Sequence, residues 1–230
     1  MLTRSIGRYL VWPVDRLAAL IAPTGIPPNV ITWGALVSNL WAGILFAAGR
    51  FAAAGGMMIL ACLCDLLDGP VARRQGRVSI FGAFLDSILD RYADLILFLG
   101  LLVYYATVNR FLYAVLAGAA MAGSVMVSYA RARAESLVPT FEIGFFERPE
   151  RLALMILGAL FNRMPVALWI LAIGPNITVI HRILHTWKQT KHAAPGEAIT
   201  ARTAQPAASD ITLEVPAATP ILRRSARRGG

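Results

Sequence analysis

Long apolar runs without charge constrain the fold of this chain more than any other feature. Ile31–Gly49 and Phe111–Ala130 contain no charged residue, and a helix needs about 20 apolar residues to cross the hydrocarbon core of a bilayer. Charged residues make up only 15% of the 230 residues, whereas soluble domains average roughly 25%. This deficit indicates a bilayer as the solvent, so the expected fold class is an all-α integral membrane protein.

Three further apolar runs bring the expected number of transmembrane helices to six. Phe51–Cys64 is short, and Phe84–Thr107 is long enough but contains three aspartates and an arginine. Leu152–Ile180 is interrupted at 162–165 by the sequence NRMP, which is typical of a tight turn between two helices. We therefore predict six transmembrane helices, the last two of which come from this interrupted run.

The boundaries of this helical region follow from length and composition. Leu152–Phe161 alone covers about 15 Å at 1.5 Å per residue, so the fifth helix is expected to begin near Glu147. Leu2–Ala22 mixes charged and apolar residues and is predicted to form an interfacial amphipathic helix broken at Pro13. The chain then divides into an N-terminal interfacial segment (1–27), a six-helix domain (28–190) and a disordered basic tail (191–230).

The distribution of basic residues predicts the orientation in the membrane. One side receives a single arginine per turn, namely Arg50, Arg110 and Arg163. The other side receives all the remaining clusters, and positive loops stay in the cytoplasm. Both termini and the active site are therefore expected on the cytoplasmic face of the cell (inner) membrane. This distribution accounts for the net charge of +9 without a nucleic-acid partner, and membrane lipids are the expected surroundings.

Four carboxylates form the most informative cluster. Asp65 and Asp68 are three residues apart, and Asp86 and Asp90 are four apart, so each pair shares one helix face. Charges within membrane helices cost at least ~2.5 kcal/mol each on insertion scales, and four clustered acids repel one another. Hard divalent cations with oxygen ligands are the natural compensation. The alternative is internal ion pairing, with Arg73, Arg74, Arg91 and Asp94 as the available groups.

The residues between the carboxylates suggest a diphosphate site. Gly69 and Gly82 let a ligand or a backbone approach closely, and Arg73 supplies a planar fork of donors suited to phosphate. His181 and His185 are four apart and could form a metal pair, although headgroup contact or packing is the simpler interpretation. Cys62 and Cys64 are interpreted as small packing residues.

The stretch from Asp65 to Asp90 resembles the signature of the CDP-alcohol phosphotransferase family, D-x2-D-G-x2-A-R-x8-G-x3-D-x3-D, at all eight fixed positions. Residues 28–32 (PNVIT) resemble the family's P-N-x-x-T start of the first helix. The resemblance implies CDP-diacylglycerol as donor, six membrane helices per subunit and a homodimer. It implies two divalent ions, Mg²⁺ or Mn²⁺, held by Asp65, Asp68, Asp86 and Asp90. It implies contacts to the CDP-lipid from Asn29, Thr32, Asp65, Gly69, Ala72, Arg73 and Gly82. Asp90 matches the last aspartate of the signature, to which the family assigns the role of catalytic base.

The acceptor is suggested by a second resemblance. Ser128–Gly158 is similar to the bacterial phosphatidylinositol phosphate synthases, which carry S-Y-x-K-A-R-A-E followed by E-R-P-E-R. The resemblance implies a basic pocket for the phosphate of inositol phosphate, made here of Arg131, Arg151 and Arg182, with Arg133 and Arg148 nearby. The family's pocket lysine is replaced by arginine at 131, which keeps the charge but changes its donor geometry. The alternative for these arginines is positive-inside anchoring.

The expected activity is therefore transfer of a phosphatidyl group from CDP-diacylglycerol to inositol phosphate, giving phosphatidylinositol phosphate and CMP. The archaeal inositol phosphate synthases resemble the same loop. The runner-up is the same chemistry with another anionic acceptor, chiefly glycerol 3-phosphate. An ion-coupled transporter that uses the acids as an ion path is a third possibility, and the uninterrupted Asp/Gly/Arg signature argues against it.

Overall fold

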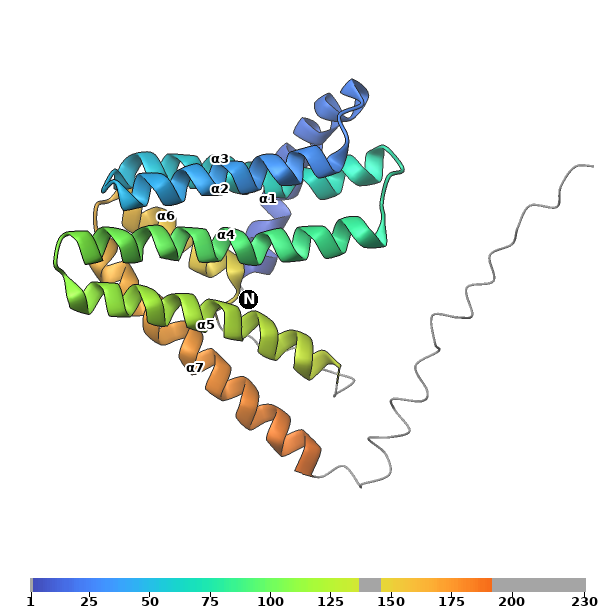
Figure 1. The fold of residues 1–230 in the computed structure, drawn as a ribbon. Helices are drawn as coiled ribbons and strands as arrows, with labels where there is room; N and C mark the ends of the chain where they lie inside the picture. The colour runs from blue at the N-terminus through green and yellow to red at the C-terminus, as the bar shows by residue number, and fades with distance from the viewer. Residues whose placement is uncertain (1, 137–145, 192–230) are drawn as a thin grey trace, which may run out of the picture. The chain divides into compact units, whose positions relative to one another are not determined.

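The computed structural model describes residues 2–136 and 146–191, and every regular element in them is helical. Figure 1 shows the order of these helices along the chain. They are α1 (Leu2–Ile21), the short 3-10 turn η1 (Ala22–Thr24), α2 (Pro28–Ala47), α3 (Phe51–Arg74), α4 (Ile80–Thr107), α5 (Phe111–Glu135), α6 (Arg148–Leu160) and α7 (Met164–Lys191). The predicted all-α class is confirmed, while the loop residues 137–145 and the tail from 192 onward lie outside the described residues.

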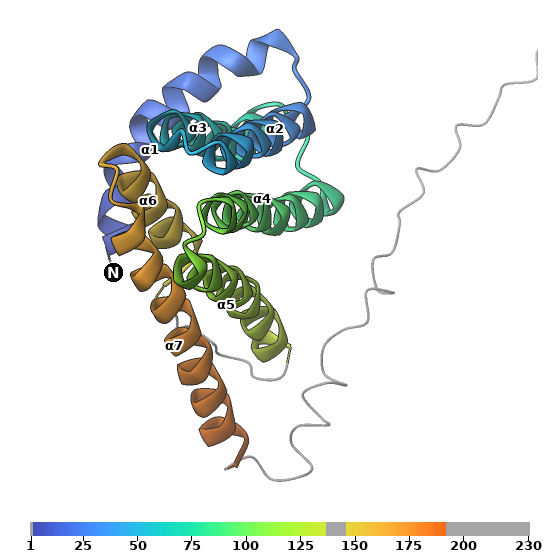
Figure 2. The same cartoon turned by 60° about the vertical axis from the view of Figure 1, so that its left-hand side comes forward.

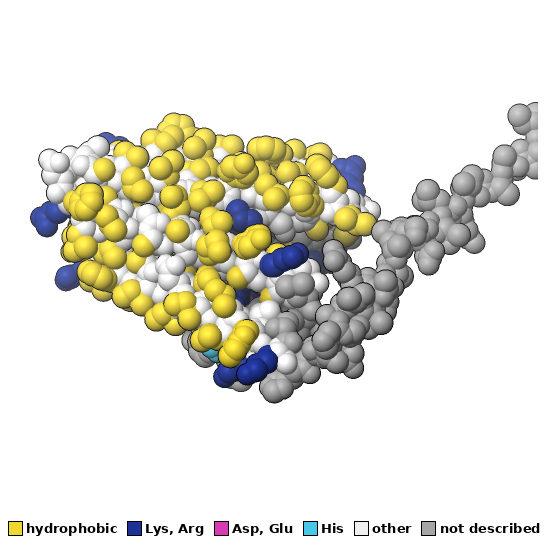
Figure 3. All heavy atoms as spheres, turned by 60° about the horizontal axis from the view of Figure 1, so that its bottom comes forward, with side chains coloured by type: hydrophobic (Ala, Val, Ile, Leu, Met, Phe, Trp, Pro, Cys, Tyr) yellow, Lys and Arg dark blue, Asp and Glu magenta, His cyan; other side chains and the backbone are white. Residues whose placement is uncertain are grey.

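Four helices in the described part of the chain are long and apolar enough to cross a membrane, namely α2, α3, α5 and α7. Helix α4 has 28 residues but carries Asp86, Asp90, Arg91 and Asp94, and α6 has only 13 residues. Apolar side chains cover most of the face drawn in Figure 3. The chain is therefore an integral membrane protein with several apolar helical spans.

The predicted boundaries of α6 agree with the structure. Glu147 is the N-cap residue of α6, as the length argument required. The turn between α6 and α7 occupies residues 161–163 and overlaps the expected NRMP turn (162–165) at two residues, because Met164 and Pro165 already belong to α7. Pro149 lies in the first turn of α6. A backbone N–H at this position has no partner within the helix, so the missing N–H of proline costs no hydrogen bond.

Helix α2 packs against both α3 and α4, α5 packs on α4, and α6 packs on α3 (Figures 1 and 2). The largest buried cluster includes Phe46, Leu97 and Phe98. Helices α2 and α4 approach so closely that a Cβ on Gly100 would lie 2.2 Å from the carbonyl oxygen of Gly43. This contact holds α2 and α4 together. The N-terminal ends of these two helices carry residues predicted to bind the donor or the metal ions.

The N-terminal helix differs from the prediction in one respect. Helix α1 continues through Pro13 instead of breaking there. The missing N–H of a proline weakens a helix, but Val14 and Ala18, just after it, pack against Leu67 and Val71 of α3. That tertiary contact stabilises the turns that local sequence alone disfavours.

Gln75 ties the connection between α1 and α2 to the loop between α3 and α4. Its Nε2 donates hydrogen bonds to the carbonyl oxygens of Ala22 at 3.2 Å and Ile26 at 3.0 Å. The loop that follows leads directly into α4. The N-terminal segment therefore helps to set the position of the loop that joins the two aspartate-bearing helices.

Candidate active site

Three of the four predicted ligand carboxylates converge. Asp65 and Asp68 project from α3 and Asp86 from α4, and one oxygen of each lies within 4.8 Å of the others. All three side chains are half-buried. Oxygen donors at this spacing match the ligand chemistry of Mg²⁺ or Mn²⁺, which bind carboxylates readily. The residues present therefore fit a divalent ion.

A cavity of about 280 Å³ borders this cluster. Six of the seven residues predicted to contact the CDP-lipid line it, and Asp65 is the exception. The lining residues are Pro28, Asn29, Thr32, Asp68, Gly69, Ala72, Arg73, Arg77, Val78, Ser79, Gly82, Ala83 and Asp86. The cavity thus places small residues and two arginines beside two of the converging carboxylates.

Local hydrogen bonds hold the walls of the cavity. The Thr32 hydroxyl donates to Asp68 Oδ2 at 2.9 Å, which links α2 to α3. Ser79 is the N-cap of α4, and its Oγ accepts a hydrogen bond from the Gly82 backbone N–H at 2.9 Å. A Cβ at Gly82 would lie 3.0 Å from that Oγ, so the absence of a side chain keeps the wall open.

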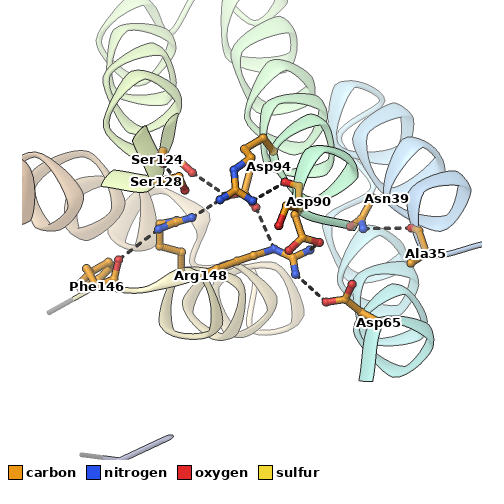
Figure 4. Close-up of polar contacts among 12 residues, drawn as sticks. Ala35, Asn39, Asp65, Asp90, Asp94, Ser124, Ser128, Phe146 and Arg148 are labelled. Carbon is orange, nitrogen blue, oxygen red and sulfur yellow. Dashed lines mark hydrogen bonds and ion pairs between the residues drawn. The ribbon is translucent and has the colours of Figure 1, made fainter. Parts of the chain in front are cut away.

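Asp90 has a different environment from the other three carboxylates. Its Oδ1 lies 2.9 Å from Nη2 of Arg148, whose Nη1 donates to Asp65 Oδ2 at 2.6 Å. Arg148 comes from the start of α6, so a guanidinium from a third helix links α3 to α4 (Figure 4). The converging group does not include Asp90, and Arg148 pairs both with Asp90 and with Asp65, which belongs to that group.

Asp94 anchors a second part of the network. It is 6% exposed and accepts hydrogen bonds from the Ser124 hydroxyl and from Nη2 of Arg151, both at 2.7 Å. Arg148 Nε lies 3.8 Å from its other oxygen. Arg151 is 2% exposed and also donates to the Phe146 carbonyl at 3.2 Å. Both α6 arginines are thus held by acidic residues of α4.

The three arginines predicted to bind the acceptor phosphate have separate partners in the described residues. Arg131 is exposed and pairs with Glu147 at 3.0 Å. Arg182 is buried, and its Nη1 donates to the carbonyl oxygen of Val127 at 2.5 Å. Part of the expected acceptor loop, residues 137–145, lies outside the described residues.

The sequence did not predict the pairing of Arg148 with Asp65 and Asp90, or the hydrogen bond from Ser124 to Asp94. A usable signal was the spacing of Asp90 and Asp94, four residues apart on one helix face. The histidines at 181 and 185 do not belong to the converging acidic group. Both cysteines are free, and Cys62 packs against the main core as expected of a small packing residue.

The fold and the site together define a class, namely a helical membrane protein with a cavity beside a cluster of carboxylates able to bind metal. Residues 26–188 match the family described as CDP-alcohol phosphatidyltransferase. The chain belongs to this family, which makes it an enzyme of phospholipid synthesis and excludes the transporter alternative.

Two named relatives match most of the chain. An archaetidylinositol phosphate synthase of Pyrococcus horikoshii is 34% identical over 178 residues, covering 77% of this chain and 92% of the relative. A phosphatidylinositol phosphate synthase of Streptomyces avermitilis is 33% identical over 209 residues, covering 84% of this chain and 85% of the relative.

Solved structures show the same fold. A crystal structure of Mycobacterium tuberculosis phosphatidylinositol phosphate synthase with CDP-DAG bound has a TM-score of 0.69 at 31% identity, covering 81% of this chain and 96% of that one. A second structure of that enzyme, in complex with manganese and citrate, has a TM-score of 0.69 at 32% identity, covering 81% and 91% respectively.

Proposed function

We propose that this enzyme transfers a phosphatidyl group from CDP-diacylglycerol to inositol phosphate, releasing CMP. The observation that carries the proposal is the cavity of about 280 Å³ with Asp68 and Asp86 in its wall. The names of the bacterial relatives and the bound CDP-DAG in one structural relative support the donor and the acceptor.

The cavity residues are assigned to the donor. Gly69 and Gly82 leave room for the cytidine nucleotide, together with Asn29, Thr32 and Ala72. Arg73 offers charge-assisted hydrogen bonds to the diphosphate oxygens. Divalent ions, when bound, neutralise charge on the phosphoryl oxygens and on the departing CMP. Asp65, Asp68, Asp86 and Asp90 are the residues that would hold two such ions.

The acceptor reacts through its hydroxyl group. The hydroxyl oxygen forms a bond to the phosphorus that carries diacylglycerol, and the bond from that phosphorus to the CMP oxygen breaks. Asp90 takes the hydroxyl proton, as a general base must in the transition state. Its Oδ1 lies 2.9 Å from Nη2 of Arg148, which fixes the position of this carboxylate. Arg151 and Arg182, with Arg131, are assigned to the acceptor phosphate.

An acceptor panel tests this assignment. Purified protein would receive CDP-diacylglycerol, Mg²⁺ or Mn²⁺, and in turn inositol phosphate, free inositol and glycerol 3-phosphate, with CMP release as the measurement. We expect turnover with inositol phosphate and little with free inositol. Preferred use of glycerol 3-phosphate would identify that compound as the acceptor. Equal use of free inositol would contradict the assignment of a pocket for the acceptor phosphate.

We also propose six transmembrane helices, with α4 and α6 as the additional spans and α1 at the interface, and a homodimer as the assembly. Cysteines replacing Ala48 and Val108 in a background without native cysteines should react with an impermeant reagent from outside the cell. A cysteine replacing Val78, which is 69% exposed, should react only after the membrane is opened. Labelling of position 78 in intact cells would reverse the orientation.

Gly82→Ala tests the donor cavity. The new Cβ would lie 3.0 Å from Ser79 Oγ and 3.7 Å from Asn29 Oδ1, so it narrows the cavity. We expect the KM for CDP-diacylglycerol to rise about tenfold, in line with the roughly 1–3 kcal/mol cost of overpacking a fitted site. Gly34→Ala is the matched control on α2, because a Cβ there meets nothing within 4 Å. An unchanged KM in Gly82→Ala would place the nucleotide elsewhere.

A further inference from the structure

Arg148 places a positive charge inside the acidic cluster. Its guanidinium lies 2.6 Å from an oxygen of Asp65 and 2.9 Å from an oxygen of Asp90, which stand on different helices. The side chain is only 22% exposed, and it reaches Asp65 across 83 residues of sequence. Figure 4 shows the guanidinium between the two carboxylates. The arginine therefore uses two carboxylates that are also assigned to metal.

A third acid, Asp94, lies near the guanidinium on its Nε side. Nε of Arg148 lies 3.8 Å from Asp94 Oδ1, while the other oxygen of Asp94 is occupied by Ser124 and Arg151. Asp94 is buried and is not part of the converging carboxylate group. It therefore supplies Arg148 with a counter-charge that no metal ion has to share.

The geometry divides the acids into two sets. Asp65, Asp68 and Asp86 can hold one ion, since one oxygen of each already lies within 4.8 Å of the others, and Asp65 also contacts Arg148 through Oδ2. A second ion has to recruit Asp90, whose Oδ1 is engaged by Arg148. A guanidinium and a divalent cation on the same carboxylates repel each other strongly in a half-buried site, where screening by water is weak.

We propose that Arg148 is a built-in counter-cation that competes with the second metal ion for Asp65 and Asp90. The first ion can bind while the guanidinium keeps its contact with Asp90. The second binds only as the guanidinium gives up Asp90, and Asp94 retains the arginine during this exchange. The negative diphosphate of the donor favours the exchange because it adds ligands for metal. This inference rests on the two-ion site of the proposed function.

Equilibrium binding of Mn²⁺ to the purified protein, followed by electron paramagnetic resonance, tests the competition without any turnover. We expect two classes of site in the wild-type protein. In Arg148→Ala the weaker site should tighten by about tenfold or more, since the lost ion pair consists of charge-assisted hydrogen bonds. In chelator, the same variant should melt several degrees below the wild-type protein, because its acids then repel without compensation. Arg50→Ala removes an equal charge from an exposed position just before α3 and should change neither quantity.

Arg148→Lys tests the same competition if the alanine variant does not fold. Lysine retains the charge but lacks the fork that spans two carboxylates, so its weaker Mn²⁺ site should be tighter than in the wild-type protein. A second site that is unchanged or weaker in the folded variants would overturn the competition. Binding of a single Mn²⁺ per wild-type chain, even with CDP-diacylglycerol present, would instead refute the two-ion part of the proposed function.

Discussion

Asp86→Asn is expected to reduce CMP release by about a thousandfold or more. The substitution removes one charged ligand from three carboxylate oxygens that lie within 4.8 Å of one another. Metal stabilisation of developing phosphoryl charge is worth several kcal/mol, and each ~1.4 kcal/mol is a factor of ten in rate. CMP release with saturating CDP-diacylglycerol and inositol phosphate measures this loss, and Mn²⁺ binding should weaken in parallel.

Asp15→Asn is the matched control for this change. Asp15 lies on α1, outside the cavity and the acidic group, and its replacement should leave turnover near the wild-type level. Chelator should inactivate the wild-type protein, and Mg²⁺ or Mn²⁺ should restore it. Turnover of Asp86→Asn within a few-fold of wild type would show that this carboxylate is not a ligand needed for the reaction.

Arg151→Ala is expected to raise the KM for inositol phosphate tenfold or more while that for CDP-diacylglycerol changes little. A charge-assisted hydrogen bond to phosphate contributes roughly 1.5–3 kcal/mol, and the donor cavity is lined by other residues. Arg110→Ala, an exposed arginine in the turn before α5, is the control for loss of charge. An equal rise in the KM for both substrates would show that Arg151 does not bind the acceptor phosphate.

The structure adds a second consequence of removing Arg151. Its guanidinium lies 2.7 Å from the buried Asp94, so the alanine variant leaves that carboxylate with fewer partners. Losing one member of a buried pair costs about 3–5 kcal/mol, and Arg148, 3.8 Å away, offsets only part of it. The double variant Arg151→Ala with Asp94→Asn should regain thermal stability yet keep the high KM for inositol phosphate. Recovery of a normal KM in the double variant would assign Arg151 a purely structural role.

Much of this molecule follows from local sequence. Apolar runs predict where α2, α5 and α7 lie, because burial in lipid needs length and lack of charge. The spacing of Asp65 and Asp68 on one helix, and the position of Asp86 after a short loop, predict the convergence observed in the structure. Six of the seven residues predicted to contact the donor line one cavity, and their contact with the donor stays a prediction.

The continuation of α1 through Pro13 and the pairing of the α6 arginines were decided by tertiary structure. Sequence spacing identifies neighbours on one helix face, but it does not say which face of a distant helix will pack opposite. The sequence placed Arg148 and Arg151 at the acceptor pocket or at a membrane anchor, and the structure adds that they pair with acids of α3 and α4. A buried guanidinium needs counter-charge, and the acids closest to it in space lie more than 50 residues away in sequence. The packing of α6 against α3 brings Arg148 to Asp65, and the same arginine and Arg151 reach the acids of α4.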